Sequence, residues 1–495
     1  MKKILVFKIL IIAALQIGCS SNPDPEIVVI DPVEDINLPP STFDYRIEKN
    51  ESGTEVVISW SKSIDPENEL VTYSVYLDNV LLGEGLEVKE FEFTDLLEQT
   101  SYSVKIIAKD PQGNETIKVS SFTTVKYYLR YSKFYNFDDV FVPGGRPYSI
   151  IKTSSGEYVI AGHSNRPDSN GKQFFVLKID EQGNEKWKNF YLYQIGDASF
   201  FKITELRDQN FVLAAGNDII KIDSDGNLIW HKEIEGYGDG GSSTIKSVKE
   251  DSKGNLLVVG IRSFYSNPNI NHGGSVTKLD ELGNILWDKE YTPVRYSYFQ
   301  DLVVTESDDL IILGSLSRGD SNSNYDFWVV ATNNDGEKLW ERTYGTTRDD
   351  FPYQIIKTND GNYAFCGGSN FGLNQNASLY KIDLNGNEIW NNMYSHNNFN
   401  NFSLTETNDG GFAATGYNSG SFRLSLTFLK YDNSGNVQWE KLFYKFAHDS
   451  LGHGILQTDD GGFIAAGVDD DFGTGGFGTR IWVVKTDPEG YFGEF

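Results

Sequence analysis

One ten-residue pattern occurs seven times between residues 126 and 495, and it constrains the fold more than any other feature of the chain. A well-formed copy is KIDSDGNLIW (221–230), in which an Asp, a Gly–Asn pair and a Trp stand at fixed spacing. The glycines of the copies lie 43 to 57 residues apart, a period typical of the four-stranded blade of a β-propeller. They are Gly183, Gly226, Gly283, Gly336, Gly386, Gly435 and Gly490.

The acidic start of each copy has two interpretations, a calcium loop or a turn between two strands. A calcium loop needs about six oxygen ligands and a closing Glu. Here a strand pattern begins directly after Asn227, and the second acid, Asp225, is replaced by Gln182 or Ser434 in other copies. We therefore interpret the pattern as a turn, in which Asp223 accepts hydrogen bonds from the backbone and Gly226 takes a positive φ.

Each unit contains four strand-like segments, which in the fifth unit are 353–358, 363–367, 378–383 and 388–394. The second segment ends on a glycine, which indicates close approach of another backbone. The seventh unit lacks its fourth segment, and residues 127–135 resemble that segment in sequence. The sequence thus predicts an all-β chain whose residues 126–495 form a seven-bladed propeller, with the last blade closed by a strand from the N-terminal side.

The recurring Asp, Gly and Trp resemble the tryptophan-docking repeat of quinoprotein-like propellers. The resemblance implies that each Trp packs between neighbouring blades. It covers residues 126–495 but concerns scaffold residues only, and nothing matches a quinone site. We therefore expect no cofactor.

Residues 42–125 show period-two alternation of apolar residues broken by turns, which is typical of a β-sandwich. Trp60 ends one strand pattern, and Leu96, Thr100 and Tyr102 follow at spacings of four and two. These residues resemble the core Trp and the tyrosine corner of the fibronectin type III domain. The resemblance implies a spacer domain more often than a binding module.

The N-terminus reads as an export signal. Residues 1–18 carry Lys2 and Lys3 ahead of a short apolar run that ends close to Cys19. The stretch resembles a bacterial lipoprotein signal, which implies that Cys19 carries lipid. Residues 19–41 are rich in proline and acid and are expected to form a tether. We expect a lipid-anchored protein of the outer membrane or cell surface, with the lipid bilayer as a partner.

Charge and motifs exclude several functions. The net charge of −27 repels phosphate backbones, so nucleic acid is not an expected partner. The sequence contains no nucleophile elbow, no phosphate-binding glycine loop and no Cys/His pair, and its adjacent carboxylates cannot flank a bond from opposite sides. The other Cys, Cys366, stands where related segments have Ala, and we expect it in the core. We predict that the protein is not an enzyme.

A binding site is expected on the propeller face that carries the longer connections, because binding residues concentrate in loops on rigid scaffolds. Aromatic, amide and acidic side chains there suit a glycan, and a protein ligand stays open. A polysaccharide-active enzyme and a scaffold for envelope assembly are the alternatives. Five of the six histidines are also placed in these loops, without a metal-ligand spacing, so no metal is expected. The candidate residues are Tyr237, Tyr296, Tyr298, Asp350, Phe351, Phe371, His396 and Asp470.

Overall fold

The computed structural model describes fifteen segments of the 495-residue chain, which together contain strands and turns but no helix. Among these residues, accordingly, no helix is long and apolar enough to cross a membrane. Cys19 and the signal lie outside the described residues, as does the tether up to residue 36. The described segments are 37–49, 54–135, 145–165, 172–195, 202–234, 244–263, 272–291, 293, 296–319, 324–371, 374–395, 399–418, 424–443, 449–471 and 478–492.

The chain divides into two compact units, residues 1–127 and 128–495. The first is a sandwich of two antiparallel sheets, with strand orders β1-β2-β5 and β4-β3-β6-β7. Its strands are β1 (Tyr45–Lys49), β2 (Val56–Trp60), β3 (Thr72–Leu77), β4 (Val80–Leu86), β5 (Glu90–Phe93), β6 (Ser101–Lys109) and β7 (Glu115–Thr123).

Two aromatic side chains hold the sandwich in the way that the sequence predicted. Trp60 is buried between the sheets against Tyr73, with the ring centroids 5.4 Å apart. The Tyr102 hydroxyl accepts a hydrogen bond of 2.9 Å from the backbone N–H of Leu97, which forms the expected tyrosine corner.

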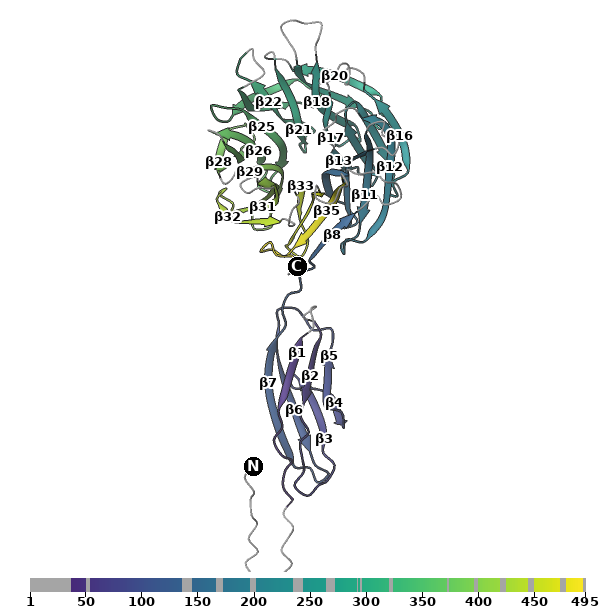
Figure 1. Ribbon diagram of the computed structural model, residues 1–495, viewed down its shortest axis with the longest axis vertical. Helices are drawn as coiled ribbons and strands as arrows, with labels where there is room; N and C mark the ends of the chain where they lie inside the picture. Colours follow the sequence, from purple (N-terminus) through teal and green to yellow (C-terminus); the bar gives the residue numbers. More distant parts are fainter. Residues whose placement is uncertain are drawn as a thin grey trace, which may run out of the picture. The chain divides into compact units, whose positions relative to one another are not determined.

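The second unit is a seven-bladed propeller, as predicted. Seven four-stranded antiparallel sheets follow one another along the chain. We call their strands A to D from the axis outward. The A strands contact each other in an unbroken ring from β9 through β13, β17, β21, β25, β29 and β33 back to β9. Viewed onto the ring, strands such as β13, β17, β21 and β33 surround the centre, while β12, β16, β20, β28 and β32 form the rim (Figure 1).

The first four blades are built as follows. Blade 1 holds β9 (Arg146–Lys152), β10 (Tyr158–Asn165), β11 (Lys172–Ile179) and β12 (Glu185–Ile195). Blade 2 holds β13 (Lys202–Glu205), β14 (Phe211–Ala215), β15 (Asp218–Ile222) and β16 (Leu228–Glu233). Blade 3 holds β17 (Thr244–Glu250), β18 (Leu256–Ser263), β19 (His272–Leu279) and β20 (Ile285–Tyr291). Blade 4 holds β21 (Ser297–Val304), β22 (Leu310–Ser317), β23 (Tyr325–Thr332) and β24 (Lys338–Tyr344).

The remaining blades complete the ring. Blade 5 holds β25 (Asp350–Lys357), β26 (Tyr363–Phe371), β27 (Asn374–Ile382) and β28 (Glu388–Tyr394). Blade 6 holds β29 (Phe399–Glu406), β30 (Phe412–Asn418), β31 (Ser425–Tyr431) and β32 (Val437–Phe443). Blade 7 holds β33 (Asp449–Gln457), β34 (Phe463–Asp471), β35 (Gly478–Thr486) and, from the other end of the unit, β8 (Tyr131–Tyr135).

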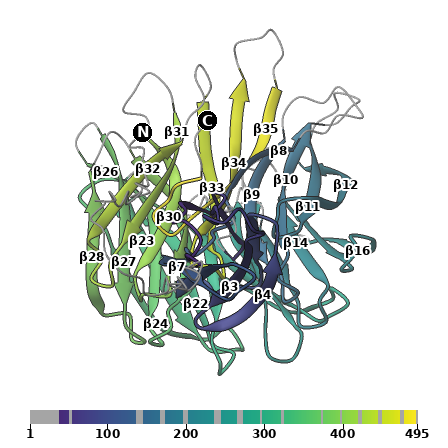
Figure 2. The same cartoon turned by 90° about the horizontal axis from the view of Figure 1, so that it is seen from below.

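Strand β8 closes the ring where the sequence predicted a closing strand. It pairs antiparallel with β35, from Tyr131 opposite Lys485 to Tyr135 opposite Ile481, and the two strands lie side by side in both views (Figures 1 and 2). Phe134 stacks on Trp482 with centroids 5.7 Å apart. The pairing removes the open edge that β35 would otherwise present.

The turn interpretation of the repeat is also correct. In the copy at 223–227, Oδ1 of Asp223 accepts hydrogen bonds from the backbone N–H groups of Asp225 and Asn227, at 3.0 and 2.8 Å. The Asn227 amide donates to Oδ2 of Asp223 at 2.9 Å, and Gly226 has φ of 83°. The carboxylate of Asp223 is therefore used to hold its own turn.

The repeated Trp docks on the turn glycine of the next blade. Space for a side chain at Gly386 is filled by the Trp340 ring of the blade before it, and the same holds from Trp187 at Gly226 through Trp439 at Gly490. Tyr131 of β8 replaces the Trp at Gly183. The structure shows a second contact that the sequence analysis did not predict. Four Tyr residues, each four positions after the docked ring, donate a hydrogen bond from the hydroxyl to the carbonyl of the same glycine. They are Tyr135, Tyr191, Tyr291 and Tyr344.

Candidate functional site

Six of the A strands carry a β-bulge at one equivalent position in the described residues, and these bulges build the site. In β21, Phe299 pairs with Gly314 and Asp301 pairs with Leu313, so Gln300 is the extra residue. Six of the seven A strands repeat this register shift. The equivalent residue of blade 2, Phe201, lies outside the described residues. We call the six extra residues the axial bulge residues, and they are Tyr148, Lys246, Gln300, Tyr353, Phe402 and His453.

The glycine that ends the B segment is explained by the bulge. A side chain at Gly314 would overlap the carbonyl oxygen of Tyr298, and one at Gly367 would overlap that of Phe351. The close backbone approach expected from the sequence is therefore that of the bulged A strand. Blade 2 departs from the pattern, since Ala215 ends its B strand and Gly216, with φ of 64°, begins a tight connection to β15.

The axial bulge residues of neighbouring blades touch each other, which shows that their side chains converge. Tyr353 meets Phe402 edge-on with centroids 4.7 Å apart, and Phe402 stacks on His453 at 5.5 Å. His453 then meets Tyr148 at 5.1 Å. Blades 5, 6, 7 and 1 thus contribute a continuous aromatic arc. The arc lies near the start of each A strand, just after the connection from strand D of the blade before.

Blades 3, 4 and 5 line an open cavity of about 320 Å³, which adjoins the aromatic arc at Tyr353. Three axial bulge residues line it, so the bulges supply an ammonium group, an amide and a phenol to one space. Aromatic walls with a few polar groups are the usual composition of a small-ligand site. The complete lining is Thr244, Lys246, Ile261, Tyr298, Gln300, Phe351, Pro352 and Tyr353.

A layer of hydrogen bonds holds the bulged strands against one another. Asp301, 2% exposed, accepts from the Ser247 hydroxyl at 2.7 Å and from the backbone N–H of Ile355 at 3.2 Å, which joins blades 3, 4 and 5. The Ser403 hydroxyl donates to the side-chain carbonyl of Gln354 at 2.9 Å, which joins blades 5 and 6. The residue after each of these bulges therefore fixes the geometry while the bulge residue itself faces the axis.

Two of the predicted site residues, Tyr298 and Phe351, line the cavity. Both precede a bulge by two residues and belong to β21 and β25 rather than to loops. Burial raises the pKa of the Tyr298 phenol. Tyr296 is not part of the lining, since its ring packs against His272 at 5.8 Å.

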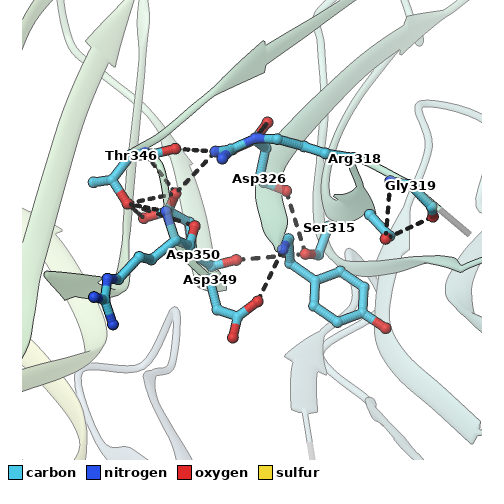
Figure 3. Close-up of polar contacts among 10 residues, drawn as sticks. Ser315, Arg318, Gly319, Asp326, Thr346, Asp349 and Asp350 are labelled. Carbon is cyan, nitrogen blue, oxygen red and sulfur yellow. Dashed lines mark hydrogen bonds and ion pairs between the residues drawn. The ribbon is translucent and has the colours of Figure 1, made fainter. Parts of the chain in front are cut away.

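Asp350 lies in a different environment from the one expected of a ligand-binding acid (Figure 3). Its carboxylate is fully buried and accepts a hydrogen bond of 2.6 Å from the backbone N–H of Thr346, with the Arg318 guanidinium 4.0 Å away. Burial raises its pKa. Asp350 therefore organises the connection between blades 4 and 5, as does Asp349, which accepts from the Tyr325 backbone at 3.0 Å.

Asp470 is likewise used within the fold. It lies in β34, is 7% exposed and pairs with Arg146 at 3.2 Å, and burial raises its pKa.

The loop placement of the histidines was wrong for three of them, because the strands extend further than the glycine punctuation suggested. His163 belongs to β10, His272 to β19 and His453 to β33.

Three candidates cannot be placed at the site. Tyr237 and His396 lie outside the described residues, and Phe371 ends β26 with a side chain that is not described.

One group of described side chains has the composition of a cation site. Asp218, His231 and Glu233 lie on the two outer strands of blade 2, and their ligand atoms fall within 4.8 Å of one another. Nε2 of His231 is 2.6 Å from the Asp218 carboxylate, so this pair is satisfied by itself. Burial raises the pKa of Asp218, and the arrangement reads as a hydrogen-bonded pair that belongs to the fold.

Sequence reasoning missed all six axial bulge residues, although a signal for them exists. Each lies fourteen residues before the glycine that ends the B segment of its blade, from Tyr148 before Gly162 to His453 before Gly467. A bulge interrupts the alternation of faces along a strand. The position is therefore visible only when the units are aligned on their glycines.

One family model matches the first unit of the chain. Residues 38–124 match the family model of the fibronectin type III domain. No curated protein matches the chain.

The solved structures that are similar to this chain are distant from it in sequence. A protein of unknown function from Bacteroides caccae is 12% identical, with a TM-score of 0.38 over 58% of this chain and 93% of that one. A quinonprotein alcohol dehydrogenase-like protein from Bacteroides thetaiotaomicron is 12% identical, with a TM-score of 0.35 over 78% and 91%. The β-propeller domain of the Trilobed protease from Pyrococcus furiosus is 10% identical, with a TM-score of 0.41 over 72% and 96%. At these identities the likenesses say nothing about what this chain binds.

Proposed function

We propose that this protein is a lipid-anchored binding protein of the outer membrane or cell surface whose propeller holds a glycan in the cavity between blades 3, 4 and 5. The observation that carries the proposal is the convergence of the axial bulge residues. Three rigid strands deliver aromatic rings, an amide and a hydroxyl to one cavity, and the aromatic arc continues beyond it. Flat rings cover the C–H faces of sugars, and polar groups bind their hydroxyls.

The lining favours binding over catalysis. Among the eight described lining residues there is no Asp or Glu, so the cavity lacks the pair of carboxylates that glycoside hydrolysis uses. A protein ligand is the competing class, and it would use the wider face rather than the cavity alone. The fibronectin type III-like unit and the tether then serve as spacers between the anchor and the propeller.

Titration of the full chain with a glycan that it binds tests the proposal. A glycan array supplies the ligand, and calorimetry measures its affinity. Tyr353→Ala should weaken binding by about 1–2 kcal/mol, because stacking contributes through contact area. Tyr296→Ala is the matched control, since this ring packs on His272 outside the cavity lining. Affinity that survives Tyr353→Ala, or turnover of the glycan, would contradict the proposal.

Anchoring has its own test. Cys19→Ala should move the protein from the membrane to the soluble fraction, because a lipid chain at Cys19 would be the attachment. A variant that stays firmly in the membrane fraction would refute a lipid at this cysteine.

A further inference from the structure

The cavity has a charge opposite to that of the protein around it. The chain carries a net charge of −27, yet Lys246 is the only charged residue among the eight described residues that line the cavity. Lys246 is an axial bulge residue, so the register of β17 fixes where its backbone lies. The fold therefore fixes the position of Lys246 in the site.

Strands β13 and β17 carry further lysines. Lys202 in β13 approaches the Asp301 carboxylate to 4.0 Å, and Lys249 follows Lys246 by three residues in β17. Burial lowers the pKa of Lys249, although the Asp301 carboxylate acts to raise it. Asp301 is already bound by Ser247 and Ile355. The Asp301 carboxylate of β21 therefore faces two lysines, Lys202 on β13 and Lys249 on β17.

Burial makes the charged form of the Lys246 ammonium less favourable. Burial lowers its pKa to about 8, which means that removal from water disfavours its charged form. An anion placed in the cavity would offset that cost, because charge-assisted hydrogen bonds strengthen where water is excluded.

We propose that the cavity recognises an acidic sugar, with the carboxylate of a uronate residue bound by Lys246 and the sugar ring held among Tyr298, Phe351 and Tyr353. Gln300 and Thr244 then bind ring hydroxyls. This inference rests on the proposed function and names the class of glycan that the site takes.

The lining favours a carboxylate-bearing sugar over other anions. Lysine is a compact point charge, whereas the planar bidentate recognition of phosphate and related groups is typical of arginine, which the lining lacks. A peptide with a C-terminal carboxylate is typically captured by successive backbone N–H groups. Here the polar groups are side chains around a space lined by three aromatic rings.

The experiment uses pairs of ligands that differ only in charge. The full chain is titrated with uronate oligosaccharides taken from an array of acidic and neutral glycans, each beside its methyl ester. The acid should bind at least about tenfold more tightly than the ester, and added salt should reduce this difference. Lys246→Gln should abolish the preference, because the affinity for the acid should fall to about that for the ester. Thermal unfolding of Lys246→Gln should stay close to that of the wild type, which would show that the variant is folded.

Each outcome separates this inference from the function beneath it. Equal binding of acid and ester, or binding of neutral glycans alone, would overturn the acidic-sugar assignment and leave glycan binding in place. A preference for the acid that survives Lys246→Gln would overturn the role of Lys246. Failure to bind any glycan, or binding of an acidic peptide instead, would overturn both the inference and the proposed function.

Discussion

Two positions recur around the propeller, and they differ in how much they vary. At the turn between strands C and D, all seven units have Gly, and six of the seven rings that dock on it are Trp. At the bulge of strand A, six described blades supply Tyr, Lys, Gln, Tyr, Phe and His. The turn contact repeats between every pair of blades, with Tyr131 in place of Trp at Gly183, so one kind of ring-on-glycine packing serves all of them. The bulge residues converge on an axis, where the six blades supply five different kinds of side chain.

The difference separates the fold from the site within a single repeat. A constant residue marks a position whose surroundings repeat, while a variable residue at fixed geometry marks a position that the fold leaves open to function. Changes at the two kinds of position test this separation through their effects on stability.

Removal of the closing strand should have the largest effect. Deleting residues 131–135 exposes the edge of β35 and removes Tyr131 from Gly183 and Phe134 from Trp482. The loss of buried aromatic contacts and of one strand should cost more than about 5 kcal/mol of unfolding free energy or cause aggregation. Chemical denaturation and light scattering measure this. A truncated chain as stable and monodisperse as the wild type would show that the constant contacts do not close the ring.

Acid should lower the unfolding free energy of the propeller through His453. Burial against Tyr148 and Phe402 lowers its pKa to about 3, and the Arg146 charge adds to the shift. The unfolded state therefore binds the proton more readily between pH 6.5 and 3, and stability falls as pH falls through this range. The loss approaches 1.4 kcal/mol per pH unit, or roughly 3 kcal/mol between pH 6.5 and 4.

The control for this prediction is His453→Phe, which keeps an aromatic ring at the bulge. The nearby titratable and charged groups, which are Arg146, Tyr148, His163 and Asp470, stay the same in both proteins. The difference in unfolding free energy between wild type and variant should therefore isolate His453. A difference that does not change from pH 7 to pH 4 would contradict its buried, neutral state.

Two glycines with the same backbone conformation test the docking contact. Gly386 and Gly361 have φ of 76° and 84°, but a side chain at Gly386 meets the Trp340 ring, whereas at Gly361 it meets open space. Gly361→Ala should cost about 1 kcal/mol for the positive φ alone. Gly386→Ala should cost about 2 kcal/mol more, because the ring must move. Equal costs by denaturant titration would show that the docked Trp does not constrain this position.

Exchange at a bulge should have the smallest effect on the fold. Tyr353→Gln gives blade 5 the residue that blade 4 already carries, and it removes one edge-to-face contact with Phe402. The cost in unfolding free energy should be about 1 kcal/mol or less. A loss larger than that of Gly386→Ala would mean that the bulge residues hold the fold and are not free to vary.

The sequence predicted the constant positions well. The Asp–Gly–Asn–Trp spacing is local, and each of its residues has one physical use in a turn or a docking contact, so the seven blades and their closure followed from it. Tyr102 and Trp60 identified the sandwich for the same reason, since each acts through a short-range contact.

The site was less accessible to sequence reasoning because it is assembled across blades. Tyr298 and Phe351 were predicted, but as loop residues, and Asp350 was predicted as a ligand-binding residue although its carboxylate is buried against Thr346. A bulge shifts the register of one strand without leaving a residue type that marks it. Lys246 and Gln300 could therefore be found only through their common distance from the glycine of the neighbouring strand.

Hydrogen–deuterium exchange of the full chain tests the separation of fold and site most directly. The probe is the uronate oligosaccharide that binds most tightly on the array, and its methyl ester is the control. Exchange should slow in β17, β21 and β25 around Lys246, Gln300 and Tyr353, while the turns such as 223–227 stay unchanged. Slower exchange confined to the turns between strands C and D, with no change around the bulges, would contradict the assignment of the binding site to the axial bulge residues.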